Sequence, residues 1–358
     1  KSNKKQWLIV KILYIRSAMN SKDISVVESL LNTPKHIVVV GHKNPDGDAI
    51  GSCLGLANFL KQKGHEVTVL MPNDFPKFLH WIPEAYQIIR YDQEIDKSVE
   101  IISKADLIFT LDFNALNRTG DLQEVLAAAT AEFILIDHHQ QPDDYAKVVY
   151  SDVTMCSTSQ MVYHFIEALQ GLEFMNPKIA TQLYVGIMTD TGSFRFPATT
   201  ALTHRVIANL IESGAKNSEI HQKVYDTNSP DRLKLLGVAL NNLVMLPEYN
   251  TAYITLAQND LTENNFKKGD TEGFVNYALS MTGVVFAIIF IENKKENIVK
   301  ISLRSKGSFS VNEFSRSHYN GGGHTNAAGG RSLLTLTETV AEFISILPKY
   351  KEALTYDA

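Results

Sequence analysis

Eight residues with carboxylate or imidazole side chains fall in four short segments of this chain, and each segment follows or ends an apolar stretch. They are His42, Asp46, Asp48, Asp112, Asp137, His138, His139 and Asp190. A single aspartate at such a place commonly caps a helix. Capping does not readily explain four clusters, because their carboxylates would repel one another unless cations lay between them. The pattern therefore predicts a metal site.

The types of side chain limit which metal ions could bind and which reaction they could catalyse. Carboxylates and imidazoles without thiolates favour manganese or magnesium, with cobalt, iron or zinc as alternatives. This number of ligands suits two cations about 3.5–4 Å apart, and a carboxylate shared between them would hold that spacing. Such a pair lowers the pKa of a bridging water and neutralises charge on a phosphoryl oxygen. We therefore expect hydrolysis of phosphate esters or anhydrides.

The elements that must position these residues alternate between strands and helices in the first half of the chain. Strands are predicted at residues 36–41, 66–71, 106–111, 132–136 and 148–150, and helices at 48–63, 122–129, 157–169 and 177–188. Asp48 is expected to cap the first helix. Apolar strands alternating with helices indicate an α/β fold, with a mainly parallel sheet covered by helices on both faces. Ligands bind beyond the carboxyl ends of such strands, where seven of the eight residues fall, and Asp190 follows the helix predicted at 177–188.

After about residue 200 the pattern changes. Helices are predicted at residues 200–214, 229–246 and 274–281, and strands at 251–256, 284–291 and 298–303. This order indicates a smaller α+β C-terminal domain, joined by a helical linker to the first domain, with the active site in the cleft. The predicted division is an N-terminal extension at 1–18, a catalytic domain at 19–205, a linker at 206–231 and a substrate-binding domain at 232–358.

A glycine-rich segment at residues 320–330 is the other candidate binding feature. Its three consecutive glycines allow backbone amides to approach an anion closely, and His324 adds a side-chain donor. Between Lys300 and Arg331 the chain carries five basic residues and one acidic residue, Glu313. This local excess of positive charge favours a phosphate-binding surface. A flexible turn and a solvated basic face are the alternatives.

Composition excludes several classes of protein. The net charge of −5 over 358 residues disfavours broad binding to duplex nucleic acid. The two cysteines, Cys53 and Cys156, cannot build a disulfide framework and indicate a reducing compartment. No apolar run reaches 18 residues, so we expect no membrane span. Lys11 interrupts the apolar run near the N-terminus, and we expect either that Met19 is the natural start or that residues 1–18 are a dispensable extension.

Five segments of the sequence resemble the DHH phosphoesterase superfamily. They are GHKNPDGDAIGS at 41–52, LDFN at 111–114, IDHH at 136–139, GIMTDTGSFRF at 186–196 and GGGHTNAAGG at 321–330. The last segment resembles the signature of the DHH-associated C-terminal domain. The resemblance covers roughly residues 20–345, and within the superfamily it is strongest to the bacterial nanoRNase and pAp phosphatase branch, the NrnA type.

The resemblance implies roles for individual residues. One manganese would be held by His42, Asp46 and Asp112, and the other by Asp48, Asp112, His138 and Asp190, so that Asp112 bridges the pair. Asp112 and His139 would be the catalytic residues, with His139 supporting the site or contacting the scissile phosphate. The substrate-binding residues would be His139, Arg304, Gly322, Gly323 and His324.

The resemblance also implies a function. The expected enzyme is a manganese-dependent phosphoesterase that hydrolyses short oligonucleotides from the 3′ end, 3′-phosphoadenosine 5′-phosphate (pAp), or both. Alternatives are a cyclic di-AMP or pApA phosphodiesterase, a pyrophosphatase or polyphosphatase, and a nucleotide-binding protein without catalysis. The expected partners are short single-stranded RNA or DNA or a nucleoside bisphosphate, in the cytoplasm and not at a membrane. A homodimer is left open.

Overall fold

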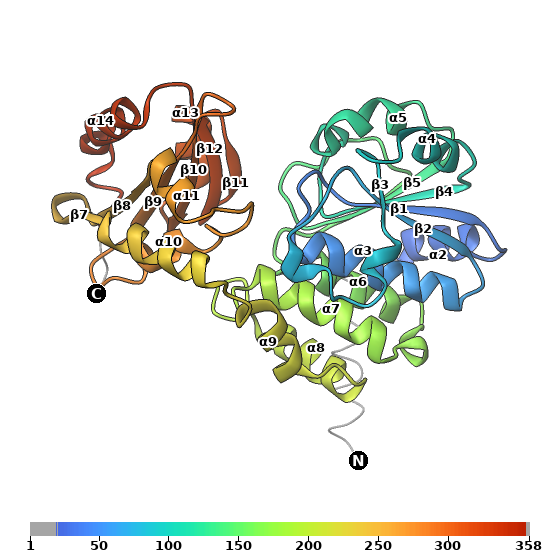
Figure 1. The fold of residues 1–358 in the computed structure, drawn as a ribbon. Coiled ribbons are helices and arrows are strands. Elements are labelled where there is room, and N and C mark those ends of the chain that lie inside the picture. The colour runs from blue at the N-terminus through green and yellow to red at the C-terminus, as the bar shows by residue number, and fades with distance from the viewer. Residues whose placement is uncertain (1–18, 20, 356–358) are drawn as a thin grey trace, which may run out of the picture. The chain divides into compact units, whose positions relative to one another are not determined.

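The computed structural model describes residue 19 and residues 21–355, so the prediction for residues 1–18 lies outside the described part. The chain divides into two compact units, one ending at Thr227 and the other beginning at Asn228. Each unit is built on a sheet of its own (Figure 1). Within the described residues, no helix combines the length and apolarity needed to cross a membrane. The predicted domain limits stay predictions.

The first unit contains a six-stranded sheet, here sheet A, in the order β3-β2-β1-β4-β5-β6. All neighbouring strands pair in parallel. The strands are β1 (His36–Val40), β2 (Glu66–Met71), β3 (Ile89–Arg90), β4 (Leu107–Leu111), β5 (Glu132–Asp137) and β6 (Val148–Ser151). The predicted parallel sheet is therefore confirmed. Its order reverses between β1 and β4, which is where a ligand crevice opens in sheets of this kind.

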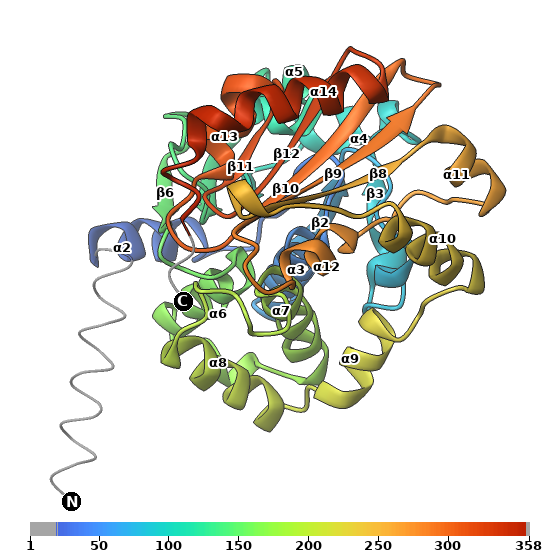
Figure 2. The ribbon, with the colours of Figure 1, turned by 90° about the vertical axis from the view of Figure 1, so that its left-hand side faces the viewer.

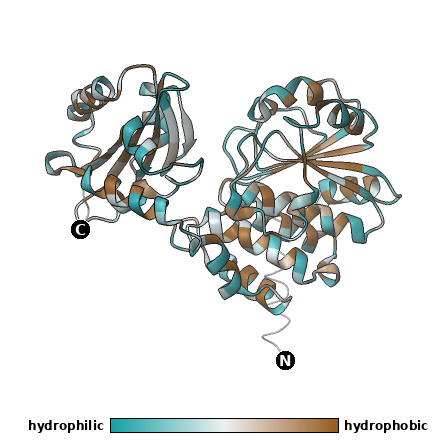
Figure 3. Ribbon diagram, in the orientation of Figure 1, coloured by the Kyte–Doolittle hydropathy of each residue, from teal (hydrophilic) through white to brown (hydrophobic). Residues whose placement is uncertain are grey.

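Helices cover both faces of sheet A, as predicted. The helices of this unit are α2 (Ser21–Leu30), α3 (Gly47–Gln62), α4 (Ile95–Ser103), α5 (Gln123–Ala127), α6 (Thr158–Ala168), α7 (Pro177–Asp190), α8 (Ala201–Glu212) and α9 (Asn217–Tyr225), of which α8 and α9 pack against α7. Figure 1 shows α4 and α5 on one face and α3, α6 and α7 on the other. The strands are apolar along most of their length (Figure 3) because both faces are buried: Val39 packs into one core and Val38 into the other.

Helix α7 packs very closely against α3 and α6. A Cβ atom on Gly51 of α3 would lie 2.4 Å from the backbone oxygen of Gln182 in α7. A Cβ atom on Gly186 of α7 would lie 1.9 Å from Oγ of Ser159 in α6. Both contacts are too short for any side chain, so glycine is required at these two positions. The start of α7 is fixed by Asn176, whose side chain caps it, and by Pro177 at its first position.

The second unit contains a mixed six-stranded sheet, here sheet B, in the order β11-β12-β10-β9-β8-β7. Only β8 and β9 pair in parallel. The strands are β7 (Val244–Leu246), β8 (Thr251–Leu256), β9 (Phe286–Asn293), β10 (Ile298–Ser305), β11 (Gly322–His324) and β12 (Ala327–Ser332). The helices are α10 (Pro230–Asn241), α11 (Gln258–Glu263), α12 (Phe274–Leu279), α13 (Val311–His318) and α14 (Leu336–Ile346).

Two cores lie on opposite faces of sheet B. Phe314 of α13 and Phe343 of α14 contribute to one core, and Leu235 of α10 and Phe274 of α12 contribute to the other. Figure 2 shows α13 and α14 on one side of the strands and α10 and α12 on the other. The second unit therefore has the predicted α+β character.

One sequence prediction for this region is wrong in detail. The helix predicted at residues 229–246 ends at Asn241, and Val244–Leu246 forms strand β7, which pairs with β8. The chain turns between β7 and β8 through Asn250, which has a left-handed φ of 46°. Helix α9 lies within the helical linker predicted at 206–231, but its bounds were not predicted, because its residues carry a weak apolar pattern in which Ile220 and Val224 are buried.

Candidate metal centre

The first cluster follows β1 directly. His42 is buried and lies two residues beyond the end of β1, and α3 begins at Gly47. The prediction that Asp48 caps α3 is wrong: the cap is Asp46, whose Oδ1 accepts hydrogen bonds from the amides of Asp48 (2.9 Å) and Ala49 (3.1 Å). The cap moves two residues upstream because Gly47 already has helical geometry. Asp48 therefore stands inside the first turn, where it is buried.

Asp48 is held by the start of α6. Its Oδ2 accepts a hydrogen bond from the amide of Thr158 (2.6 Å), and its Oδ1 accepts one from the amide of Ser159 (2.8 Å). Helix N-termini commonly bind anions through such free amides. The carboxylate is therefore fixed at both oxygens, and each oxygen keeps a lone pair for another partner.

Asp112 connects two groups of candidate ligands. It follows β4 in the left-handed backbone region, with φ 66°, and it is only 2% exposed. Its Oδ2 lies 3.6 Å from Nε2 of His42, and its Oδ1 lies 3.5 Å from Nε2 of His138. The two oxygens of one carboxylate thus face two different imidazoles.

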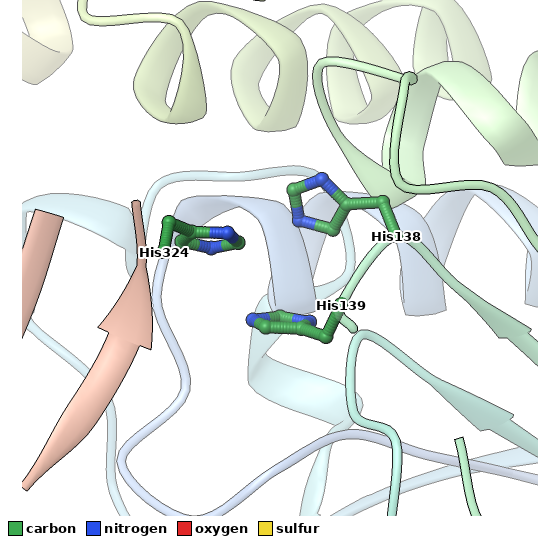
Figure 4. A group of neighbouring side chains, drawn as sticks. All are labelled: His138, His139 and His324. Atoms are coloured by element: carbon green, nitrogen blue, oxygen red, sulfur yellow. The ribbon is translucent and has the colours of Figure 1, made fainter. Parts of the chain in front are cut away.

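His138 and His139 follow β5 (Figure 4), and each has its own hydrogen-bond partner. Nδ1 of His138 lies 3.2 Å from the carbonyl oxygen of Met155, and Nδ1 of His139 lies 2.7 Å from Oδ1 of Asp137. A carbonyl only accepts hydrogen bonds, so Nδ1 of His138 carries the proton, and its Nε2 presents a lone pair to Asp112. The contact between Nδ1 of His42 and the carbonyl of Lys43 (2.9 Å) gives His42 the same tautomer.

Asp190 completes the set at the last residue of α7. Its Oδ2 lies 3.6 Å from Nε2 of His138. Strand ends and a helix end therefore bring together all six residues that were predicted to bind metal. Within the described residues of the first unit, three overlapping groups have ligand atoms within 4.8 Å of one another: His42, Asp46 and Asp112; Asp48, Asp112 and His138; and Asp112, Asp137 and His139.

The spacing of these atoms fits bound cations better than direct hydrogen bonds. Separations of 3.5–4.0 Å between imidazole nitrogens and carboxylate oxygens are too long for hydrogen bonds. Ligands about 2.1 Å from a shared cation lie about 3.0–3.4 Å apart, close to the shorter of these separations. Nitrogen lone pairs that face carboxylates repel them unless a cation lies between. The donor set therefore fits divalent cations.

Charge repulsion in the cluster also affects the pKa values of two of its aspartates. Burial raises the pKa of Asp112 well above its usual range, and the negative charges of Asp48, Asp46, Asp190 and Asp137 raise it further. Burial likewise raises the pKa of Asp48, although His138 opposes the shift. Positive charge placed among these groups would reverse both shifts.

Sequence reasoning missed three residues that hold the ligands. Thr158 and Ser159 fix Asp48, and the Thr158 hydroxyl also donates to Oδ1 of Asp112 (2.9 Å). Asp137 was noted as part of a cluster but received no role, and it is the hydrogen-bond partner of His139. Thr158 and Ser159 could have been found from the helix predicted at 157–169, because the start of this helix follows a strand at the same edge of the sheet.

The predicted substrate-binding residues of the second unit lie on one edge of sheet B. Arg304 in β10 pairs with Ala327 in β12, and Ala327 pairs with His324 at the end of β11. Directly opposed residues on neighbouring strands point to the same face of a sheet. Arg304 and His324 therefore share a face, about 10 Å apart at the backbone, with a small alanine between them.

The glycines of this edge form a strand and not a flexible turn. Gly322 and Gly323 pair with β12. The amide of Gly323 donates to Oδ1 of Asn312 (3.0 Å), so an anion at that amide would compete with Asn312. A Cβ atom on Gly323 would lie 2.4 Å from the backbone oxygen of Ala327. Glycine is therefore needed here for the close approach of two strands.

Comparisons with known proteins agree with this division of the chain. Residues 36–187 match the model of the DHH family, N-terminal domain, and residues 249–350 match the DHHA1 domain. The bifunctional oligoribonuclease and PAP phosphatase NrnA of Thermus thermophilus is 31% identical over 305 residues, which cover 85% of this chain and 86% of that protein.

Two further relatives differ in how much of their length is shared. A crystal structure of an exopolyphosphatase-related protein from Bacteroides fragilis has 37% identity and a TM-score of 0.91, covering 94% of this chain and 98% of that one. The cyclic-di-AMP phosphodiesterase PdeA of Listeria monocytogenes is 24% identical over 94% of this chain but only 51% of its own length.

Proposed function

This chain belongs to the DHH phosphoesterase family, and we propose that it hydrolyses short oligonucleotides, pAp, or both, with two divalent cations. The relative with 31% identity carries oligoribonuclease and PAP phosphatase in its name and shares most of its length with this chain. The cations, with manganese as the expected ion, would supply an activated water and neutralise charge on the reacting phosphate.

The observation that carries the proposal is the placement of Asp112. Its Oδ2 faces His42, and its Oδ1 faces His138. A carboxylate in this position can bridge two cations. In the proposed arrangement, His42, Asp46 and Asp112 hold one cation, and Asp48, Asp112, His138 and Asp190 hold the other.

His139 has a different proposed task. Its Nδ1 is held by Asp137, which fixes the ring and leaves Nε2 for a partner outside this pair. The ring is about one-fifth exposed, unlike the more deeply buried His138. We assign it to contact with the scissile phosphate.

Arg304 and His324 would bind a further phosphate of the substrate. They share one face of sheet B, and both side chains are long enough to converge on one anion above Ala327. Recognition of a second phosphate would favour short substrates that carry a terminal phosphate. Gly322 and Gly323 would allow the anion to approach the backbone.

The test is a turnover panel with the purified chain in manganese. The substrates are pAp, an RNA dinucleotide, an RNA 5-mer, pApA, cyclic di-AMP, pyrophosphate and a long single strand. Preference for pAp and short RNA is the expected result. Preference for pyrophosphate, or tight nucleotide binding without turnover, would contradict the proposal.

A second candidate function is cleavage of cyclic di-AMP or pApA. It is favoured by the similarity to the Listeria phosphodiesterase, which extends over 94% of this chain. The same panel decides between the two, because a cyclic dinucleotide has no terminal phosphate for Arg304 and His324. The cytoplasmic location and the homodimer stay predictions.

A further inference from the structure

The start of α6 touches two carboxylates that come from different strands. Ser157 caps the helix by accepting a hydrogen bond from the amide of Gln160 (3.1 Å). The next two amides, of Thr158 and Ser159, are then free to bind Asp48. All three residues from Ser157 to Ser159 are fully buried. The first turn of α6 therefore packs directly against the carboxylates of the candidate metal centre.

Thr158 also contacts Asp112, for which Ser159 has no matching contact. Its hydroxyl donates to Oδ1 of Asp112 at 2.9 Å. Within residues 21–355, no other hydroxyl or amide donates to this carboxylate. Thr158 is thus the residue whose backbone holds Asp48 and whose side chain holds Asp112.

The contact matters because a bridging carboxylate must keep one rotation about its Cβ–Cγ bond. Oδ2 of Asp112 has to face His42, and Oδ1 has to face His138. A rotation by a quarter turn would move both oxygens out of line with both imidazoles. A hydrogen bond to Oδ1 alone selects the productive rotation. Threonine suits the task, because its branched Cβ restricts its own side-chain rotation.

We propose that Thr158 is a positioning residue that fixes Asp112 as the bridge between the two cation sites. Thr158 is not itself a metal ligand in this scheme. It acts through Asp112, and its effect is greatest on the site formed with Asp48 and His138, since Oδ1 belongs to that site. The inference rests on the proposed two-cation function.

Two substitutions separate the hydroxyl from the rest of the residue. Thr158→Val keeps the shape and the amide that binds Asp48, and it removes only the hydroxyl. Thr158→Ser keeps the hydroxyl and removes the methyl group. Thr203→Val is the matched control, because Thr203 is nearly as buried and its hydroxyl contacts Thr200 at the start of α8 and the sulfur of Cys156 (3.7 Å), and not a proposed metal ligand.

The measurements are calorimetric titration of the metal-free protein with Mn²⁺ and electron paramagnetic resonance of the loaded protein, which reports spin coupling between neighbouring Mn²⁺ ions. We expect Thr158→Val to weaken the binding of one Mn²⁺ by about 10- to 100-fold and to reduce the coupling. Thr158→Ser should restore both, and Thr203→Val should leave both unchanged.

Several outcomes would overturn the inference. Thr158→Val with unchanged Mn²⁺ affinity and coupling would show that the hydroxyl positions nothing. Thr158→Ser behaving like Thr158→Val would assign the effect to methyl packing. Failure of the unmodified protein to bind two coupled Mn²⁺ ions would overturn the proposed function as well, and it would be seen before any variant is made.

Discussion

The molecule has two candidate sites that are built differently. One is the candidate metal centre of the first unit, and the other is the edge of sheet B that carries Arg304 and His324 in the second unit. The metal centre gathers buried side chains, and its carboxylates raise one another's pKa values. The edge in sheet B gathers few side chains and depends on glycine backbone, as the close approach at Gly323 shows. The first site is specified by residue type and charge, and the second by the space between strands. Substitutions should therefore damage them in different ways.

The largest effect is expected for Asp112→Asn. Asparagine tolerates the left-handed φ of this position, so the fold should persist. The loss of a charged ligand shared by two cations should lower kcat/KM by about 1,000-fold or more, since metals contribute several kcal/mol and 1.36 kcal/mol is tenfold. Steady-state kinetics and metal analysis provide the test, with exposed Asp121→Asn as the control. Near-normal turnover with two bound metals would remove Asp112 from the mechanism.

His324→Ala should damage substrate use and spare the metals. Loss of a hydrogen bond to a charged group costs about 1.5–3 kcal/mol, which corresponds to a roughly 10- to 100-fold fall in kcat/KM. Kinetics with pAp should show this fall, while Mn²⁺ stoichiometry stays the same. His36→Ala, at the exposed opposite end of β1, is the control. A loss of bound Mn²⁺ in His324→Ala would show that the two sites are not chemically separate.

Substitutions at two adjacent glycines test whether this edge of sheet B depends on the close approach of its strands. In Gly323→Ala the new Cβ would lie 2.4 Å from a backbone oxygen, so the second unit should lose about 1–3 kcal/mol of unfolding free energy. In Gly322→Ala the nearest atom is 3.4 Å away, and the change should stay within about 0.5 kcal/mol. Thermal and denaturant unfolding would measure both. Equal stabilities would refute the close approach.

The smallest effect concerns pH and metal removal. The raised pKa values of Asp48 and Asp112 stabilise the metal-free fold at low pH, and this stabilisation is lost as pH rises through them. In a chelator, unfolding temperature should therefore fall as the pH rises above 3.8, the ordinary pKa of an aspartate. Mn²⁺ should raise it more at the higher pH. The fall should be smaller in Asp112→Asn, and a fall of equal size would assign it to other groups.

The same contrast explains what could be predicted from the sequence. Five of the six strands of sheet A were predicted to within one residue at each end, because runs such as Ile37–Val40 are apolar on both faces, whereas the two-residue strand β3 was not predicted. No strand was predicted at β11, because a strand of glycines has no side-chain pattern. Its pairing with β12 depends on contacts between segments and not on local preference.

The residues proposed to bind metal could be predicted because four clusters of carboxylates and imidazoles would repel one another without cations between them. Their supporting residues were not. Thr158 is an ordinary residue for the start of a helix, and only the fold places its hydroxyl 2.9 Å from Asp112. The position of the α3 cap depended on a single helical glycine, which side-chain type does not reveal.

The close packing of α7 on α3 has a consequence for the order in which the protein is made. Asp190 lies 148 positions after His42, and it reaches the centre only when Gly186 and Gly51 have allowed α7 to dock. Synthesis proceeds from the N-terminus, so a nascent chain that has released β1, β4 and β5 from the ribosome still lacks this ligand. The proposed cation sites would then reach their full affinity only after α7 has been synthesised and has docked against α3.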